Sequence, residues 1–341
     1  MIDYIGTTFN SNSQWFTDEL EVIGLVRKQI NWHWPQGRNL FINLTWFGPQ
    51  FDNGQWDRFQ NIVGNRHVYD RLFVLAAADP SFLSLDQISE MAQAVGAKEL
   101  YHIGHFDTDW NFNFHSLVIP KYFVRYQPEE LVMQDPKWVF LNYNRKPRGH
   151  RAALVELLTQ QGLDQHGVIT LGENVNQAWG NHSAQSRTLG ETPETAVGNW
   201  GMDMSMGIPH DIHSLGNLDL WRSHFLTVVG ETEFYPWDPT FVSEKTWKPI
   251  IGGRPFLING QSKAYQWLRD RGFRTFTHLF PGNLDQATEL DIHAGIADAI
   301  KWLTAQNLTE LYQQLQPDLQ YNQQRYWEFC DEQYRRVRKL F

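Results

Sequence analysis

Hydrophobic and polar positions along the chain alternate in the block pattern of an α/β protein. Short apolar runs of strand length are separated by segments in which apolar residues recur at helical spacing, as over 84–95. The predicted strands lie at 39–44, 71–78, 99–103, 137–143, 168–171 and 225–229, within 250–260, and at 273–276. Helical patterns dominate from 285 to the end. The order of elements predicts an α/β fold with a helical C-terminus.

A polar run at 128–136 marks the boundary between two predicted lobes, because it contains two prolines and precedes a strong strand. The length of 341 residues suits two domains of roughly 100 to 200 residues each. We therefore expect an N-terminal lobe over 1–130 and a C-terminal lobe over 136–341, both Rossmann-like, with a central cleft between them. A Gly-, Asn- and Ser-rich stretch at 172–201 is typical of a functional or mobile loop.

Composition and charge narrow the class of protein. The net charge of −9 and the pI near 5.8 disfavour a general nucleic-acid binder. Cys330 is the single cysteine, which excludes an intramolecular disulfide and a cysteine-rich metal site. No apolar run is long enough to cross a bilayer and the first residues lack a secretory pattern, so we expect a soluble, cytoplasmic protein. The fifteen tryptophans either fill the core or line a groove that stacks on sugars or bases.

The segment 241–249 carries the most informative local pattern. Ser243 is a predicted N-cap, and Glu244 and Lys245 then occupy the first turn of a short helix that leads into a buried strand. The free N–H groups of a helix start, with a lysine beside them, suit a bound phosphate. This segment therefore predicts a site for a nucleotide or a nucleotide sugar.

A basic cluster follows the predicted strand at 137–143. Asn142 lies at the end of this strand, and Arg145, Arg148 and Arg151 follow at the turn into a helix. Such turns lie at the carboxyl edge of an α/β sheet, where ligands bind, and the planar arginine fork suits two phosphate oxygens. A solvated basic helix start is the alternative. Because the same lobe contains two turns that suit phosphate, this one and the one at 241–249, we favour a ligand site over a solvated helix start.

These residues resemble a known family. The segment 241–245, preceded by Gly230, Glu231 and Thr232 at the end of a hydrophobic strand, resembles the donor-binding motif of fucosyltransferase-like and related GT-B glycosyltransferases. The continuation over 248–256 looks like glycosyltransferases encoded by bacteria and phages. The resemblance covers about 136–280, and the first lobe shows none.

The resemblance implies a GT-B fold and a role for each matching residue. Lys245 would contact the donor diphosphate, Glu244 would hydrogen-bond sugar or ribose hydroxyls, and Arg145 would match a phosphate-binding arginine. Glu231 takes the place of the family's strand-end glutamate. Gly230 stands where the family often has an aromatic residue, and Thr232 (adjacent to Glu231) stands where it has Asn. These departures leave the donor base and sugar open.

Glycosyl transfer with inversion also needs a base for the acceptor hydroxyl. The first lobe offers Asp107 as the leading candidate for this base. Asp79, at a strand end, and His105 are the next candidates. Loop aspartates are also common as turn formers and caps, and that interpretation remains open. Asp107 and Asp109 form an Asp-x-Asp pattern that could hold a divalent cation. Because it lies outside the basic lobe, we expect neither a bound metal nor another cofactor.

The sequence thus predicts an enzyme that moves a sugar from a nucleotide-sugar donor to an acceptor hydroxyl, with inversion and without metal. The expected acceptor is a glycan or a lipid head group. A first alternative is a DNA glycosyltransferase that acts on a hydroxymethylated base, as in phage DNA modification. A second is a non-catalytic carbohydrate-binding protein that uses tryptophans as stacking platforms.

Overall fold

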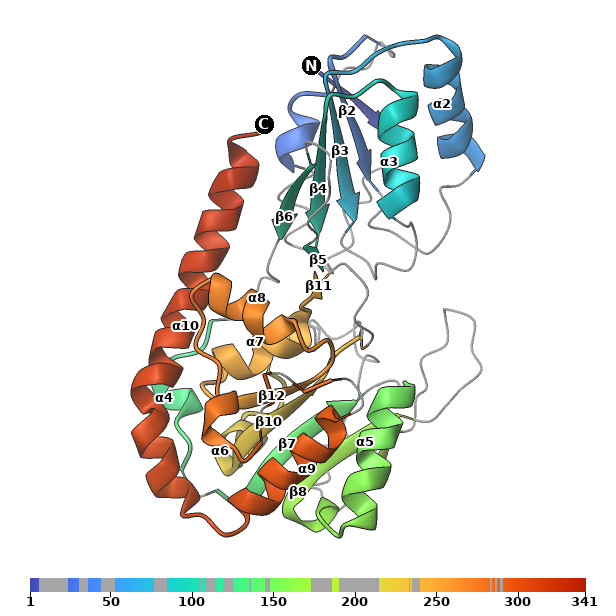
Figure 1. Ribbon diagram of the computed structural model, residues 1–341. Coiled ribbons are helices and arrows are strands. Elements are labelled where there is room, and N and C mark those ends of the chain that lie inside the picture. The colour runs from blue at the N-terminus through green and yellow to red at the C-terminus, as the bar shows by residue number, and fades with distance from the viewer. Residues whose placement is uncertain are drawn as a thin grey trace. The chain divides into compact units, whose positions relative to one another are not determined.

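The computed structural model divides the chain into two compact α/β units (Figure 1). Unit 1 comprises Met1–Tyr122 together with Cys330–Phe341, and unit 2 comprises Phe123–Phe329. The structure describes residues 1–5, 24–30, 36–43, 53–76, 85–104, 106–107, 114–118, 125–134, 136–144, 148–172, 186–189, 215–232, 234, 240–282, 284–285, 287–288 and 291–341. Each unit is built on a sheet of mainly parallel strands, which confirms the predicted α/β class.

The sheet of unit 1 consists of five parallel strands whose spatial order follows the chain. They are β1 (Ile2–Ile5), β2 (Asn39–Asn43), β3 (Arg71–Ala76), β4 (Glu99–Gly104) and β6 (Phe114–Val118). The runs 40–42 and 72–75 are apolar and buried throughout, as expected for parallel strands covered on both faces.

Helices α2 (Asn53–Gly64) and α3 (Leu85–Ala94) cover one face of this sheet, with Ile62 and Met91 in a core that includes Leu72. The other face is covered in part by the helical turn at 24–27 in the connection between β1 and β2, whose Val26 is fully buried against the sheet.

The end of the chain packs on the same face of the sheet. Tyr334, Val337 and Phe341 pack with Phe41 and Phe73 of the sheet, and the Phe341 ring lies 5.0 Å from that of Phe73. We expected the whole segment 136–341 to form the second lobe. Its last twelve residues, 330–341, group with unit 1, where Tyr334 and Val337 are buried against the face of the sheet opposite α2 and α3.

The sheet of unit 2 has its strands in the order β12 (Phe256–Asn259), β10 (His224–Gly230), β7 (Trp138–Asn144), β8 (Gly167–Gly172) and β9 (Ser186–Leu189). The first four are parallel, and β9 is antiparallel to β8. From β7 the chain adds β8 on one side and later returns to add β10 on the other. The strand order therefore reverses between β7 and β10, which is the place where open α/β sheets bind ligands.

Helices surround this sheet, and the long last helix continues from unit 2 into unit 1. They are α4 (Pro128–Leu131), α5 (Gly149–Gln160), α6 (Leu218–Ser223), α7 (Glu244–Ile251), α8 (Ala264–Asp270), α9 (Ile292–Leu303) and α10 (Leu308–Arg338). Trp221 and Trp247 are fully buried, so these two tryptophans fill the core. None of the helices among the described residues combines the length and apolar character that a bilayer crossing requires.

The predicted strand at 273–276 is wrong. These residues form an irregular segment after α8, and the Arg274 amide and carbonyl bond to the side chain of Asn322 instead of a neighbouring strand. Two strands fall in segments with a loop-like sequence: β6 begins at Phe114, at the end of the polar and aromatic stretch 104–115, and β9 lies inside 172–201. Short strands without a long apolar run carry little periodicity and are easily missed.

Candidate functional site

The carboxyl ends of β7 and β10 are neighbours at the reversal of strand order in unit 2. The segments 148–151 and 231–232, together with Phe234, follow these two strands at the same edge of the sheet. The parallel strand β12 ends there at Asn259, and α7, the helix that precedes β12, begins there at 243–246. We call these four segments the switch edge.

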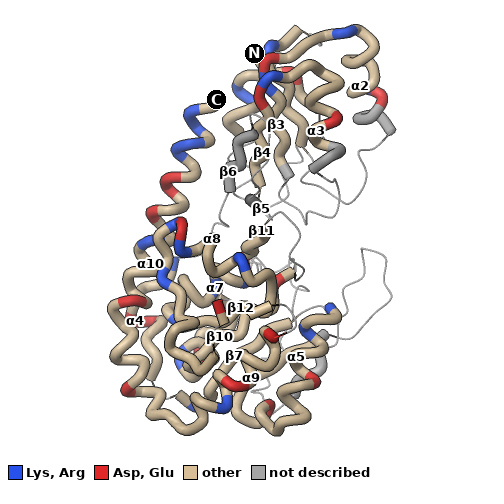
Figure 2. Tube along the Cα trace, in the orientation of Figure 1, with Lys and Arg blue, Asp and Glu red and all other residues tan. Residues whose placement is uncertain are grey.

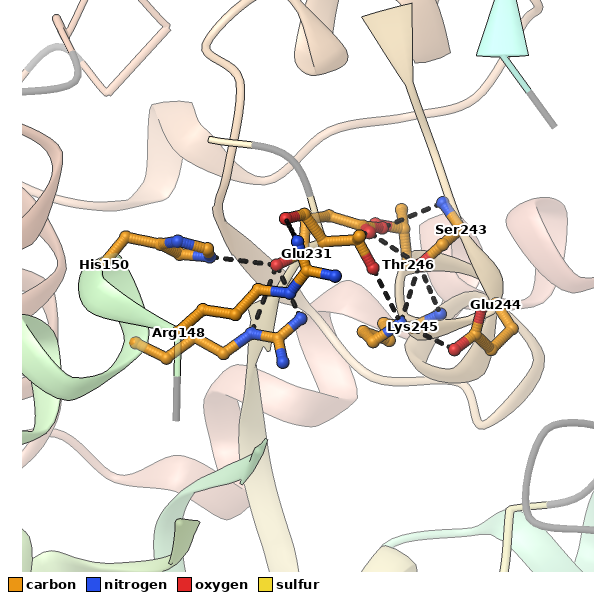
Figure 3. A network of polar contacts seen from close by, with 9 residues as sticks. Arg148, His150, Glu231, Ser243, Glu244, Lys245 and Thr246 are labelled. Carbon is orange, nitrogen blue, oxygen red and sulfur yellow. Dashed lines mark hydrogen bonds and ion pairs between the residues drawn. The ribbon is translucent and has the colours of Figure 1, made fainter. Parts of the chain in front are cut away.

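Glu231 lies at the centre of the switch edge and is almost completely buried, with 1% of its surface exposed. Its Oε1 accepts hydrogen bonds from the Ser243 amide at 3.0 Å and the Thr246 hydroxyl at 2.6 Å. Its Oε2 accepts from the Ser243 hydroxyl at 2.5 Å and the Thr232 amide at 3.1 Å (Figure 3). A buried carboxylate is stable only when such donors replace water. The Glu231 carboxylate therefore fastens the start of α7 to the end of β10.

The first turn of α7 presents a cation and a carboxylate at this edge. The Ser243 side chain accepts a hydrogen bond from the Lys245 amide at 3.3 Å, which confirms the predicted N-cap. Lys245 Nζ lies 2.6 Å from Glu244 Oε1 and 3.2 Å from Thr232 Oγ1. The Lys245 and Glu244 side chains are 28% and 20% exposed, so both reach solvent from a fixed helix start.

The first turn of α5 supplies the basic groups on the other side of Glu231. Arg148, the N-cap residue, is partly exposed and donates from Nη1 to the Thr232 carbonyl at 3.0 Å. Arg151 is buried and donates from Nη2 and Nε to the Glu231 carbonyl at 2.7 and 3.2 Å. Basic positions thus lie at the starts of both α5 and α7 (Figure 2). Among the described basic residues at these two helix starts, Arg148 and Lys245 are the ones that solvent reaches.

His150 and two residues absent from the sequence prediction form a stack of rings at the same edge. The Phe234 ring lies between the imidazoles of His150, at 4.8 Å, and His293 of α9, at 5.4 Å. His150 Nε2 bonds to the Glu231 carbonyl at 2.9 Å, which makes that nitrogen the donor and fixes the tautomer. Burial lowers the pKa of His150 to about 4, with smaller contributions from nearby cations, so the ring is neutral at pH 7.

The buried side-chain amides of Asn142 and Asn144, in β7, lie next to the switch edge. Asn142 donates to the Val228 carbonyl at 2.7 Å and accepts from Asn144 Nδ2 at 2.5 Å. In the part of the chain that the structure describes, Asn144 Oδ1 has no hydrogen-bond partner. A Cβ on Gly230 would come within 2.2 Å of this oxygen. The structure therefore leaves no room for the aromatic residue that the family resemblance leads one to expect at position 230.

The predicted donor-site residues divide into two groups. Arg148, Glu244 and Lys245 are partly exposed at the switch edge. The others that are described lie buried beneath them, with their polar atoms bonded inside the protein: Asn142, Arg151, Glu231 and Ser243. The buried group holds the exposed group in place and presents no free surface to a ligand.

Several predicted residues fall outside the described part of the chain. Arg145, Asp79 and His105 are among them, as is the side chain of Asp107, whose backbone belongs to the short strand β5 (Phe106–Asp107). Their roles remain predictions. Within the described ranges, no three His, Cys, Asp or Glu side chains cluster in a way that would hold a metal ion.

Sequence reasoning missed Phe234, Asn259 and His293. Asn259 Oδ1 lies 3.0 Å from His293 Nε2, and its Nδ2 donates to the His150 carbonyl at 3.2 Å. The only signal for Asn259 was its place at the end of a predicted strand in the same lobe. Phe234 and His293 carried none, because a lone aromatic residue in a loop and a lone histidine in a helix are common in every fold.

Comparisons with known proteins identify no relative. No protein-family model, no curated protein and no solved structure matches the chain.

Proposed function

We propose that the chain is a nucleotide-sugar-dependent glycosyltransferase of the GT-B type, in which the switch edge of unit 2 holds the donor diphosphate. One observation carries the proposal: Lys245 and Arg148 stand on either side of the buried Glu231, at the starts of two helices, where the strand order reverses. Helix starts and cations at such a point suit a ligand with two adjacent phosphates.

The chemistry of sugar transfer fits these groups. When the bond from the sugar to the diphosphate breaks, negative charge accumulates on the departing oxygen, and fixed cations stabilise it. Lys245 and Arg148 supply this charge from positions that hydrogen bonds already fix. A carboxylate such as Glu244, 2.6 Å from Lys245 in the free protein, is able to accept hydrogen bonds from donor hydroxyls.

We assign the general base and the binding of the acceptor to unit 1. Inverting transfer needs a base that removes the acceptor proton, and Asp107 stays our first candidate for it. A glycan or a lipid head group remains the proposed acceptor, since the net charge of −9 disfavours binding to a DNA duplex. In this proposal Lys245 and Arg148 stabilise the departing diphosphate, so the reaction needs no divalent metal for that purpose.

The donor site is tested by calorimetric titration of the full chain with UDP, GDP and the corresponding nucleotide sugars. We expect at least one of them to bind, and Lys245→Met to weaken it by about tenfold or more, the size of one lost charge-assisted contact. Lys301→Met is the matched control, because Lys301 is exposed near the far end of α9. Equal affinities in wild type and Lys245→Met, or no binding of any nucleotide, would refute the site.

Activity is tested by transfer of a radiolabelled sugar from the bound donor to three acceptor pools. These are free oligosaccharides, a glycolipid extract and a hydroxymethylated DNA duplex, each with Mg²⁺ or with EDTA. The proposal expects label in the first or second pool in both conditions. Label in the duplex would establish the DNA alternative, and donor binding without transfer or donor hydrolysis would favour a non-catalytic binding protein.

A further inference from the structure

A shallow depression lies in unit 2, next to α8 and α10. Its volume is about 620 Å³, within the range of roughly 300–1,000 Å³ that small-molecule sites occupy. The residues that line it come from the end of α8, from the segment after it and from one position of α10. They are Arg269, Gly272, Phe273, Arg274, Thr275, Thr277, His278, Asp285 and Asp318.

Two partly exposed ion pairs belong to the lining. Arg269 Nη1 donates to Asp285 Oδ2 at 2.9 Å and to the Thr275 hydroxyl at 3.1 Å. Arg274 pairs with Asp318, and these two side chains are 47% and 35% exposed. Each pair places a guanidinium beside a carboxylate, so each offers hydrogen-bond donors and acceptors next to one another.

Residues of α10 fix the position of Arg274 in the lining. The buried side chain of Asn322 accepts from the Arg274 amide and donates to the Arg274 carbonyl, both at 2.8 Å. The Arg274 guanidinium lies over the Tyr321 ring, 4.3 Å from its centre. A guanidinium whose backbone is clamped and whose plane is stacked loses less freedom when a ligand binds. This part of the lining is therefore organised before a ligand arrives.

The charge balance of the lining decides which ligand fits. Two arginines and two aspartates cancel, so an anion meets carboxylates and a cation meets guanidinium groups. A neutral ligand with adjacent hydroxyls meets no such repulsion, because each hydroxyl both donates and accepts. We propose that this depression binds a neutral glycan, with vicinal hydroxyls bridging the Arg274–Asp318 pair.

The depression is separate from the switch edge within unit 2. The Phe276 ring, in the segment that lines it, packs at 5.6 Å on Phe256, the first residue of β12. The switch edge lies at the other end of β12, at Asn259. The inference therefore does not rest on the proposed function. If both hold, the depression anchors a glycan chain away from the place where the diphosphate binds.

The test measures binding of neutral trisaccharides to the full chain by saturation-transfer NMR and titration. The probes are maltotriose, cellotriose and triacetylchitotriose, with a sulfated trisaccharide as the charged comparison. We expect at least one neutral probe to bind, and Arg274→Met and Asp318→Asn each to weaken it by about tenfold. Both side chains are at least a third exposed, so the variants are expected to fold, which thermal melting checks.

Lys245→Met is the control that separates the two sites. It removes a cation from the switch edge, so the expected result is unchanged glycan affinity together with weakened nucleotide affinity. Glycan binding that falls in Lys245→Met and not in Arg274→Met would place the glycan at the switch edge and overturn the inference. No binding of any neutral probe, or tighter binding of the sulfated probe through Arg274, would overturn it as well.

Discussion

The Ser243 hydroxyl and amide both donate to the Glu231 carboxylate, at 2.5 and 3.0 Å, across twelve positions of the chain. The same hydroxyl accepts from the Lys245 amide. Ser243 therefore joins the buried carboxylate at the end of β10 to the first turn of the helix that carries Lys245. Disturbing this pair should change both the stability of unit 2 and the position of the lysine.

Glu231→Gln is expected to lower the free energy of unfolding by about 2–3 kcal/mol, because hydrogen bonds to a charged group are lost and the new amide NH₂ faces other donors. Nucleoside diphosphate binding should weaken in the same variant, since the first turn of α7 loses its anchor. Chemical denaturation and titration measure the two effects. The control is Glu244→Gln, because the Glu244 side chain is partly exposed at the helix start and its replacement should change stability by about 0.5 kcal/mol or less. Wild-type stability in Glu231→Gln would show that the carboxylate does not anchor the helix.

Arg254 is predicted to be a structural residue, although the sequence placed it beside the donor motif. The guanidinium is fully buried and donates to the carbonyls of His224 (3.1 Å), Gly252 (3.1 Å), Gly253 (2.8 Å) and Trp221. Arg254→Met would leave these carbonyls without their donor, at a cost of about 3 kcal/mol or more.

Thermal unfolding should show this loss as a fall of about 6–12 °C in Tm, at the usual scale for a domain of this size. Arg38→Met is the matched control, because the Arg38 side chain is 84% exposed and its ion pair with Asp70 is worth about 1 kcal/mol or less. A Tm for Arg254→Met equal to that of the control would contradict the structural role.

Gly230→Ala is expected to destabilise unit 2 mainly through one contact. The new Cβ would lie 2.2 Å from Asn144 Oδ1, well inside van der Waals contact, and overpacking of this kind costs about 1–3 kcal/mol. In the double variant Asn144→Ala/Gly230→Ala the contact with Oδ1 is gone. The double variant should therefore lose less stability than the sum of the two single losses, which a double-mutant cycle by denaturation measures. Additive losses would mean that the cost arises elsewhere.

The sequence allowed the framework and the helix start at Ser243 to be predicted, because both depend on local patterns. Long apolar runs mark the buried parallel strands, such as β10, and an N-cap followed by Glu and Lys marks the start of α7. The covering of unit 1 by 330–341 depends on contacts between the two ends of the chain, and no local pattern encodes it.

The sequence indicated where some residues of the candidate site lie in the fold, but not the direction of their side chains. Glu231, Arg151 and Asn142 were correctly placed at strand ends and helix starts, but a sequence does not reveal which side chains face inward. The Glu231 side chain points inward because its carboxylate accepts hydrogen bonds from four donors, which belong to Thr232, Ser243 and Thr246. The stack of Phe234 between two histidines arises from three separate segments and could not be derived from any one of them.

Stability should fall as the pH is lowered from 7 to 4, and His224 is expected to be one cause. The ring is fully enclosed: Nδ1 bonds to the Leu220 carbonyl at 2.7 Å, and Nε2 to the Thr227 hydroxyl at 2.9 Å. These partners suit a neutral imidazole that donates from Nδ1 and accepts at Nε2. Burial, together with the nearby Arg254 charge, lowers the pKa of His224 to about 3.

The sign of the effect follows from the lowered pKa of His224. In the unfolded chain, His224 binds a proton below its ordinary pKa of about 6.5. In the folded protein it binds that proton only near pH 3, so acid favours unfolding. The contribution is fully present above pH 6.5, and about 2–3 kcal/mol of it should be lost by pH 4. His224→Asn, which keeps a donor near Leu220, should be less stable at pH 7 and show a shallower fall. His278→Asn, at an exposed position, should keep the wild-type slope. Denaturation curves at several pH values measure these slopes, and parallel curves for wild type and His224→Asn would rule out the buried neutral ring as a cause.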